Sequence, residues 1–597
     1  MRRRRGFEAI CEIIVFFVLL ISPVSADKEQ AFQTHRNVLG DELKEVLGCD
    51  EAMLLSGEYL RSRDMFSCLL WISDIDYEIP IREGLIAAEG QEDKLPYTVS
   101  YDEFGEKDIC VNIDPDASSE YVQTYIEVKR DKARQLYLEQ NTRFANRTLG
   151  DSVTYISKYS PCIFANLSID QIAELLNTEE ILRIDYCQSG DFVPLSYCAP
   201  FTTSDINNLT SIKIPATKIN ETKQLYNVSG WNVKVGLMDV GCPTINGVVK
   251  NENLDLGNTF DRNHADNVYT VAHTIAPNST YYASGVFDEL EQEHFYEAME
   301  WLLGNNVNVI NLSLGETICN VYNTRARWMD HIAFNHDVHI VIAAGNEGED
   351  GVLCPAMANN VITVGNVNDS FTTENTYSSY NDANGTNPDT SYMCKPDIMA
   401  PGEYSSDGGT SYSAPMVTGT IALMGNKWPN TRTQQHLVKT ALTVGTSLSK
   451  RFVTYSSDFR EYGSGVLDSR RAFYVINNNR YVALGEVSVT NTTATYTFNV
   501  TSTSEIVRIG LTYTNRIKFP TSDHSVGNLP TGNIGNVSLE VYSPSNNYIG
   551  SVTHPYANVK LIHIDPALYG TGTYTVKIKL LVGQSGGQVT KFSWGWR

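Results

Sequence analysis

Four polar residues in the middle of the chain have the types and positions that nucleophilic catalysis requires. Asp239 and Asn346 each follow a predicted apolar strand, and His264 and Ser411 each stand at the start of a predicted helix. Binding sites of open α/β sheets form at the carboxyl ends of the strands. A serine at a helix N-terminus meets unpaired N–H groups and a dipole that favour negative charge. The pattern therefore predicts a nucleophile, a base, a carboxylate and an amide at one edge of a sheet.

Each of these residues also has a plain structural interpretation. Ser411 could cap its helix, and Ser413 could cap it equally well. Asp239 fits an ordinary turn, and His273 competes with His264 as the base. Only the combination of all four sites favours catalysis.

The segment that carries these residues alternates strands and helices between about 200 and 478. Its strand candidates are continuous apolar runs at 233–238, 307–312, 339–344 and 360–364, and an amphipathic helix is predicted over 288–303. Buried strands between helices indicate a parallel sheet covered on both faces. We therefore expect an α/β fold in this segment.

Several motifs in the same segment resemble the subtilisin-like serine proteases (subtilase family, peptidase S8). Residues 409–415 match the family's G-T-S-x-x-x-P, and 395–402 resemble its K-P-D-I-x-A-P-G. Residues 343–347 resemble A-A-G-N-E, and 311–315 resemble the strand along the substrate edge. The family is the standard example of a triad in the chain order Asp, His, Ser. The resemblance covers about 205–478 and implies the subtilisin-like parallel sheet.

The resemblance implies a role for each site residue. Ser411 would be the nucleophile, His264 the base and Asp239 its partner, and Asn346 would donate to the oxyanion. The substrate-binding residues that it implies are Leu312, Ser313, Leu314, Gly315, Ala343, Ala344, Gly345 and Glu347. Small residues there predict a roomy pocket for a large apolar side chain before the scissile bond, while Glu347 at its rim could accept a basic one.

Three residues depart from the family's pattern. Val240 stands after the aspartate where Ser or Thr is usual, and His264 is followed by Ala265 and Asp266 instead of Gly and Thr. The carboxylate of Asp266 could perturb the base. These departures put the assignment of His264, and full activity, in question.

Two further units flank this segment. Residues 101–195 resemble the inhibitory propeptide of subtilases, chiefly over 153–185, where Ser168 and Gln171 form a predicted capping box. A permanent N-terminal domain is the alternative, and residues 27–100 remain unassigned. Residues 479–597 alternate apolar and polar side chains with period two, which predicts an antiparallel β-sandwich.

The N-terminus and the composition indicate an exported protein. Four arginines, an apolar run of about a dozen residues and Val24-Ser25-Ala26 are typical of a signal peptide over 1–26, with an uncleaved anchor as the alternative. The net charge of −23 argues against nucleic acid as a partner. Ten cysteines remain after the signal, which permits disulfides in an exported chain.

We therefore expect a secreted serine endopeptidase, made as a self-processing zymogen, whose partners are protein or peptide substrates and its own propeptide. Catalysis would need no cofactor. Family members often hold structural Ca²⁺, but no D-x-D-x-D-G loop occurs and the family's ligands cannot be matched here. A catalytically impaired scaffold and a surface adhesin that acts through the β-domain are the alternative functions.

Overall fold

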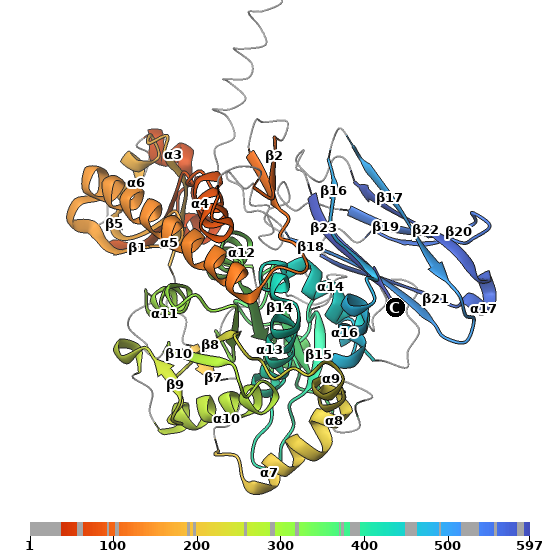
Figure 1. The fold of residues 1–597 in the computed structure, drawn as a ribbon. Coiled ribbons are helices and arrows are strands. Elements are labelled where there is room, and N and C mark those ends of the chain that lie inside the picture. Colours follow the sequence, from red (N-terminus) through yellow and green to blue (C-terminus); the bar gives the residue numbers. More distant parts are fainter. Residues whose placement is uncertain are drawn as a thin grey trace, which may run out of the picture.

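The computed structural model describes residues 38–56, 64–91, 95–101, 107–187, 192–194, 199–255, 259–286, 293–316, 322–368, 371, 375–381, 394–447, 462–488, 491–514, 537–553, 558–581 and 590–597. These residues form an N-terminal α+β unit, a parallel-sheet unit and a β-sandwich (Figure 1). The expected signal peptide, 1–26, lies outside them. None of the described helices is long and apolar enough to cross a membrane.

A seven-stranded parallel sheet forms the middle unit, as the sequence predicts. Its strands run in the order β15-β14-β13-β11-β8-β10-β9. They are β8 (Lys234–Asp239), β9 (Val248–Lys250), β10 (Thr280–Gly285), β11 (Val309–Leu312), β13 (His339–Ala343), β14 (Ile362–Val367) and β15 (Ile398–Pro401). Because all strands are parallel, their carboxyl ends meet at one edge.

Helices cover both faces of this sheet. The first face lies under α10 (Thr259–Ile275) and α13 (Thr410–Lys427), and the second lies under α11 (Glu293–Gly304) and α12 (Thr324–Asn335). Successive strand residues point to opposite faces, which is why nearly every strand position is apolar. The remaining helices of this unit are α7 (Thr203–Asn208), α8 (Ile214–Ala216), α9 (Ile219–Tyr226), α14 (Gln435–Gly445) and α16 (Ser469–Asn477).

The helix that carries His264 is longer than expected. The sequence predicts a short helix from His264 to about residue 272, but α10 begins at Thr259 and ends at Ile275. His273 therefore lies in the last turn of the same helix, where its ring stacks on Tyr269 at a centroid distance of 5.1 Å. His273 thus lies more than two turns along the helix from His264.

The N-terminal unit is a four-stranded antiparallel sheet in the order β4-β5-β1-β6. Its strands are β1 (Met65–Ile72), β4 (Val153–Ile156), β5 (Cys162–Ser168) and β6 (Ile181–Tyr186), and its helices are α2 (Asp41–Leu47), α3 (Glu51–Ser56), α4 (Glu78–Glu89), α5 (Ser119–Phe144) and α6 (Ile169–Leu175). The capping box of Ser168 and Gln171 is present at α6. Because β1 lies between β5 and β6, the domain boundary expected at residue 100 would divide the strands of a single sheet between two domains.

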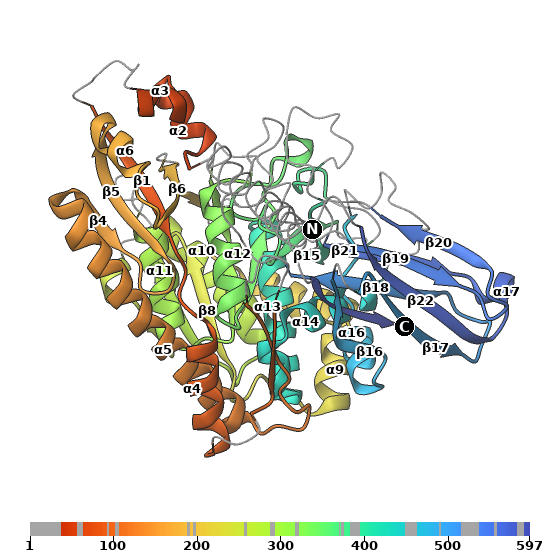
Figure 2. The same cartoon turned by 90° about the horizontal axis from the view of Figure 1, so that it is seen from above.

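One face of this N-terminal sheet packs on α11 and α12 (Figure 2). Trp71 and Phe164 lie in the same apolar cluster as Phe295 and Trp328. At the edge of the contact, Arg130 of α5 is 1% exposed and donates to three main-chain carbonyls of the middle unit. The two units therefore share this core, while the other face of the N-terminal sheet packs on α2, α3 and α6 in a separate apolar cluster.

The C-terminal unit is the predicted β-sandwich, with sheets β16-β23-β18-β21 and β17-β22-β19-β20. Its strands are β16 (Tyr481–Val487), β17 (Thr493–Val500), β18 (Val507–Tyr513), β19 (Val537–Tyr542), β20 (Tyr548–Val552), β21 (Val559–Ile564), β22 (Gly572–Leu580) and β23 (Thr590–Trp596), and a short helix, α17 (Pro566–Tyr569), precedes β22. The sandwich packs on α14 and also meets the hairpin of β2 (Tyr97–Tyr101) and β3 (Lys107–Val111), where Lys591 Nζ donates to Ile109 O at 2.6 Å. No disulfide joins two cysteines within the described residues.

Candidate active site

The structure brings Asp239 and His264 together. Asp239 is the last residue of β8, and His264 lies on the face of α10 that covers this end of the sheet. His264 Nδ1 is 2.8 Å from Asp239 Oδ1, and the two side chains are 0% and 2% exposed. Because a carboxylate only accepts, Nδ1 carries the proton. His264 Nε2, which has no hydrogen-bond partner among the described residues, is then the basic nitrogen.

Val240 and Asp266, two of the residues that depart from the family's pattern, each form hydrogen bonds near this pair. Val240 N donates to Asp239 Oδ1 at 2.8 Å, so the main chain holds the carboxylate although the Val240 side chain cannot. Asp266 accepts from Thr244 N at 2.7 Å and from Thr244 Oγ1 at 2.5 Å. The carboxylate of Asp266 thus caps a turn near residue 244.

Ser411 lies in the first turn of α13. The helix has Gly409 as its N-cap, at φ 154°, and no side-chain cap, so neither serine considered for capping takes that role. Ser411 Oγ donates to Ser313 O at 3.3 Å, while Ser313 Oγ donates to Ser411 O at 2.8 Å. Ser413 Oγ instead donates to Asn366 Oδ1 at 3.2 Å. Ser411 is therefore held at the carboxyl end of β11.

Asn346 follows β13 and is oriented by the residue before Ser411. Thr410 N and Thr410 Oγ1 both donate to Asn346 Oδ1, each at 3.1 Å. With its oxygen held in this way, the half-buried Asn346 side chain leaves Nδ2 to donate elsewhere. This is the orientation that an oxyanion donor needs. Thr410 was not singled out from the sequence, although it is part of the G-T-S motif.

The expected substrate-binding residues lie on two adjoining segments. Leu312 ends β11 and Ser313 follows it, while Leu314 and Gly315 belong to β12 (Leu314–Glu316). Ala343 ends the neighbouring strand β13, and Ala344, Gly345 and Glu347 follow it. Gly345 has φ 113°, and a Cβ there would lie 2.9 Å from Leu353 Cγ and from Ser379 Oγ. Glu347 is exposed. The two segments are thus brought together beside Ser411.

A segment of the chain itself occupies the free edge of β12. Strand β7 (Phe192–Pro194) pairs with β12 in antiparallel fashion, with Gly315 opposite Val193 and Leu314 opposite Pro194. A free strand edge presents unpaired N–H and C=O groups that bind an extended peptide. The sequence gave no signal for this pairing, because it joins residues more than 120 positions apart.

Two more residues of the site were missed in the sequence. Tyr412 stacks obliquely on His264, with a centroid distance of 5.6 Å and an interplanar angle of 40°. Its hydroxyl donates to Asp407, a residue 8% exposed whose pKa is raised by burial to about 6. Tyr412 stands at a variable position of the G-T-S-x-x-x-P motif and Asp407 lies outside it, so only the fold shows that they lie beside the imidazole.

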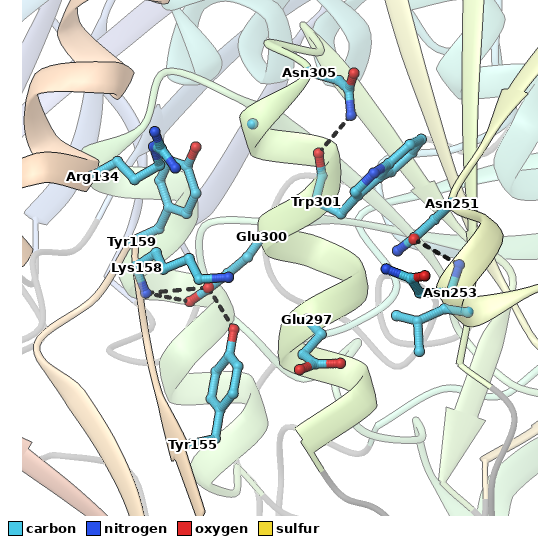
Figure 3. A pocket seen from close by; sticks show the side chains of 12 residues that line it. Arg134, Tyr155, Lys158, Tyr159, Asn251, Asn253, Glu297, Glu300, Trp301 and Asn305 are labelled. Atoms are coloured by element: carbon cyan, nitrogen blue, oxygen red, sulfur yellow. Dashed lines mark hydrogen bonds between the residues drawn. The ribbon is translucent and has the colours of Figure 1, made fainter. Parts of the chain in front are cut away.

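A cavity of about 380 Å³ lies elsewhere, between the N-terminal unit and α11 (Figure 3). On its wall, Glu300 of α11 is 4% exposed and accepts from Tyr155 Oη at 2.6 Å, Ser157 Oγ at 2.5 Å and Lys158 N at 3.0 Å. Burial raises the pKa of Glu300. Glu300 thus links the parallel-sheet unit to the turn after β4.

The described residues contain no group of three or more His, Cys, Asp or Glu side chains that could hold a metal ion.

Comparison with known proteins finds similarity in the middle unit. The model of the subtilase family matches residues 248–465, a range that contains His264, Asn346 and Ser411 and begins after Asp239. Subtilisin of Bacillus pumilus is 31% identical over 193 residues, covering 29% of this chain and 64% of that protein. Subtilisin E of Bacillus subtilis (strain 168) is also 31% identical, with 46% of its length covered. Subtilisin DY of Bacillus licheniformis is 28% identical over 270 residues, covering 39% of this chain and 92% of that protein.

The chain thus spans about half to two thirds of the length of the first two relatives. Among solved structures, an epidermin leader peptide processing serine protease from Staphylococcus aureus is 18% identical with a TM-score of 0.41, and the match covers 57% of this chain and 96% of that one. The motifs around Ser411, the parallel sheet and the family match agree, and residues 248–465 of the parallel-sheet unit match the model of the subtilase family.

Proposed function

We propose that the chain is a serine endopeptidase that hydrolyses protein or peptide substrates through Ser411, His264 and Asp239. The observation that carries the proposal is the buried 2.8 Å hydrogen bond between Asp239 and His264 Nδ1. It leaves His264 Nε2 as the base, in a site where Ser411 stands at a helix N-terminus. Asp, His and Ser in this chain order also agree with the family.

The mechanism follows from these positions. Ser411 Oγ attacks the scissile carbonyl carbon while His264 Nε2 takes the hydroxyl proton and then passes it to the leaving amine. Water, deprotonated by the same nitrogen, releases the acyl group from Ser411. Asn346 Nδ2 and the Ser411 N–H would stabilise the oxyanion, and loss of one such donor costs about 10²–10³ in kcat in subtilisin itself.

We also propose that the chain is made as an inhibited zymogen. In the full-length chain β7 pairs with β12, the edge that is expected to bind substrate, and His264 and Ser411 are both 0% exposed. A substrate cannot pair with β12 while β7 does. The signal-like sequence at 1–26 supports export, so we propose that activation and activity are extracellular.

The register of β7 suggests where the zymogen is cut. Pro194 pairs with Leu314, and Ser313, the residue before Leu314, accepts from Ser411 Oγ through its main-chain carbonyl. In the sequence, Pro194 is followed by Leu195 and Ser196. We therefore propose the bond between Leu195 and Ser196 as the cleavage site, with a large apolar residue before it.

Fluorophosphonate labelling and intact mass of the purified chain test the proposal. We expect the wild type to be labelled and shortened to a mature chain that begins at Ser196. Ser411→Ala should remain unlabelled and keep residues 27–195. Ser413→Ala is the matched control, since it removes another buried serine hydroxyl of the same turn, and it should still be labelled.

Labelling of Ser411→Ala, or peptide hydrolysis that this variant retains, would rule out Ser411 as the nucleophile. A labelled chain that begins elsewhere would keep the activity and overturn the cleavage site.

A further inference from the structure

Asp407 joins the chain on both sides of Ser411. Its Oδ1 accepts from Gly408 N at 2.8 Å, and its Oδ2 accepts from Tyr412 Oη. Gly408 precedes the nucleophile by three residues, and Tyr412 follows it directly. Asp407 thus holds the loop and the helix turn that present Ser411.

The hydrogen-bond donors around Tyr412 specify the ionised form of Asp407. Asn267 Nδ2 donates to Tyr412 Oη at 3.3 Å, and Asn267 is itself held by Phe201 N and by Ala199 O. An amide nitrogen can only donate, so the single proton of the Tyr412 hydroxyl goes to Asp407. Gly408 N is a second donor to Asp407. Asp407 must therefore accept both hydrogen bonds, and its ionised carboxylate form does so.

The ring of Tyr412, whose hydroxyl Asp407 holds, packs against the imidazole of His264. Tyr412 and His264 are both 0% exposed, and their rings meet at 5.6 Å and 40°. Asp239 fixes one nitrogen of the imidazole, and the Tyr412 ring packs against its side. We infer that Asp407, acting through Tyr412, is a positioning residue for His264 in the hydrolysis proposed above, on which this inference rests.

Burial and the charges that face Asp407 set the pH at which it titrates. Burial raises its pKa to about 6, His264 opposes that rise, and Asp205 adds to it. Asp205 is held by Ser405 and Ser406, and Tyr404 N donates to the main-chain oxygen of Asp407. Asp407 therefore loses its charge in mildly acidic solution, where the network around Tyr412 loses its acceptor.

The test is the pH dependence of kcat/KM for the full chain after self-processing, with a coumarin amide of Phe-Val-Pro-Leu as substrate. In the wild type we expect the acid limb of log kcat/KM to approach a slope of two, because two groups must lose a proton. Asp407→Asn should reduce the slope to one and lower kcat at pH 8 about 100-fold through misplacement of the base. Asp266→Asn, which removes a carboxylate two residues from His264, should keep the slope of two.

Tyr412→Phe supplies a second variant in case Asp407→Asn fails to fold. It keeps the ring and removes the hydroxyl, and we expect the same change of slope. An unchanged acid limb in a variant that fluorophosphonate still labels would overturn the inference and leave the proposed function intact. A wild type that is not labelled at any pH would overturn the proposed function and this inference with it.

Discussion

The N-terminal unit and the C-terminal sandwich both pack on the parallel-sheet unit, but they do so in different ways. The N-terminal sheet places Trp71 and Phe164 in one apolar cluster with α11 and α12. The sandwich encloses a separate apolar cluster between its two sheets. At its contact with α14, Val559 and Leu561 of β21 join the apolar cluster of the parallel-sheet unit, beside a 2.7 Å hydrogen bond between Thr440 and Thr512.

This difference shows which unit can fold alone. A sheet with one face covered by another unit has no complete core without that unit. A sandwich covers each sheet with the other and needs no partner. The N-terminal unit is therefore built to be held by the parallel-sheet unit, while the sandwich is an added domain.

Separate expression of the two units should give the largest effect. We expect residues 481–597 to unfold cooperatively and residues 38–187 to lack a cooperative transition. The latter would expose Leu69, Trp71 and Phe164, at about 1.5–3 kcal/mol each, which is comparable to the whole stability of a small domain. Circular dichroism melting measures this, and a sharp transition in the 38–187 fragment would contradict the shared core.

Substitution of Arg130 tests the polar edge of the shared core. Its guanidinium donates to His336 O, Val307 O and Asp337 O at 2.7–3.0 Å, and Arg130→Met leaves these carbonyls without that donor. We expect the chain to lose about 3 kcal/mol of stability in chemical denaturation of the Ser411→Ala background.

The control for Arg130 lies on the same helix. Arg143 pairs with Glu139 on the surface, with both side chains more than two-thirds exposed, so Arg143→Ala should change the stability little. Equal losses of stability in both variants would mean that the buried hydrogen bonds of Arg130 contribute no more to stability than the surface ion pair of Arg143.

Glu300 should give the smallest effect, seen in the pH dependence of stability. Burial raises its pKa in the folded chain, so folding favours the protonated form. The contribution of Glu300 is therefore fully present below the unfolded value, about pH 4, and is lost as pH rises through the folded pKa. Glu300→Gln should flatten this part of the profile of unfolding midpoint against pH, and an unchanged slope would contradict it.

The features that could be predicted from the sequence are those that local residue patterns determine. Apolar runs buried on both faces indicated the parallel sheet, period two indicated the sandwich, and the motif around Ser411 indicated the candidate nucleophile. It missed the central place of β1, whose partner β5 follows about 90 residues later. It also missed β7 on β12 and Asp407 beside Tyr412. These contacts join distant segments, and no spacing along the chain encodes them.

The two sides of the shared core are synthesised at different times on the ribosome. Trp71 emerges early, but the residues of α12 that cover its sheet emerge roughly 260 residues later, a delay of about 15–50 seconds at usual translation rates. During that interval the apolar face of the nascent N-terminal sheet has no native cover. The N-terminal sheet therefore passes through a stage in which this face is open to non-native contacts, whereas the sandwich can close on its own core.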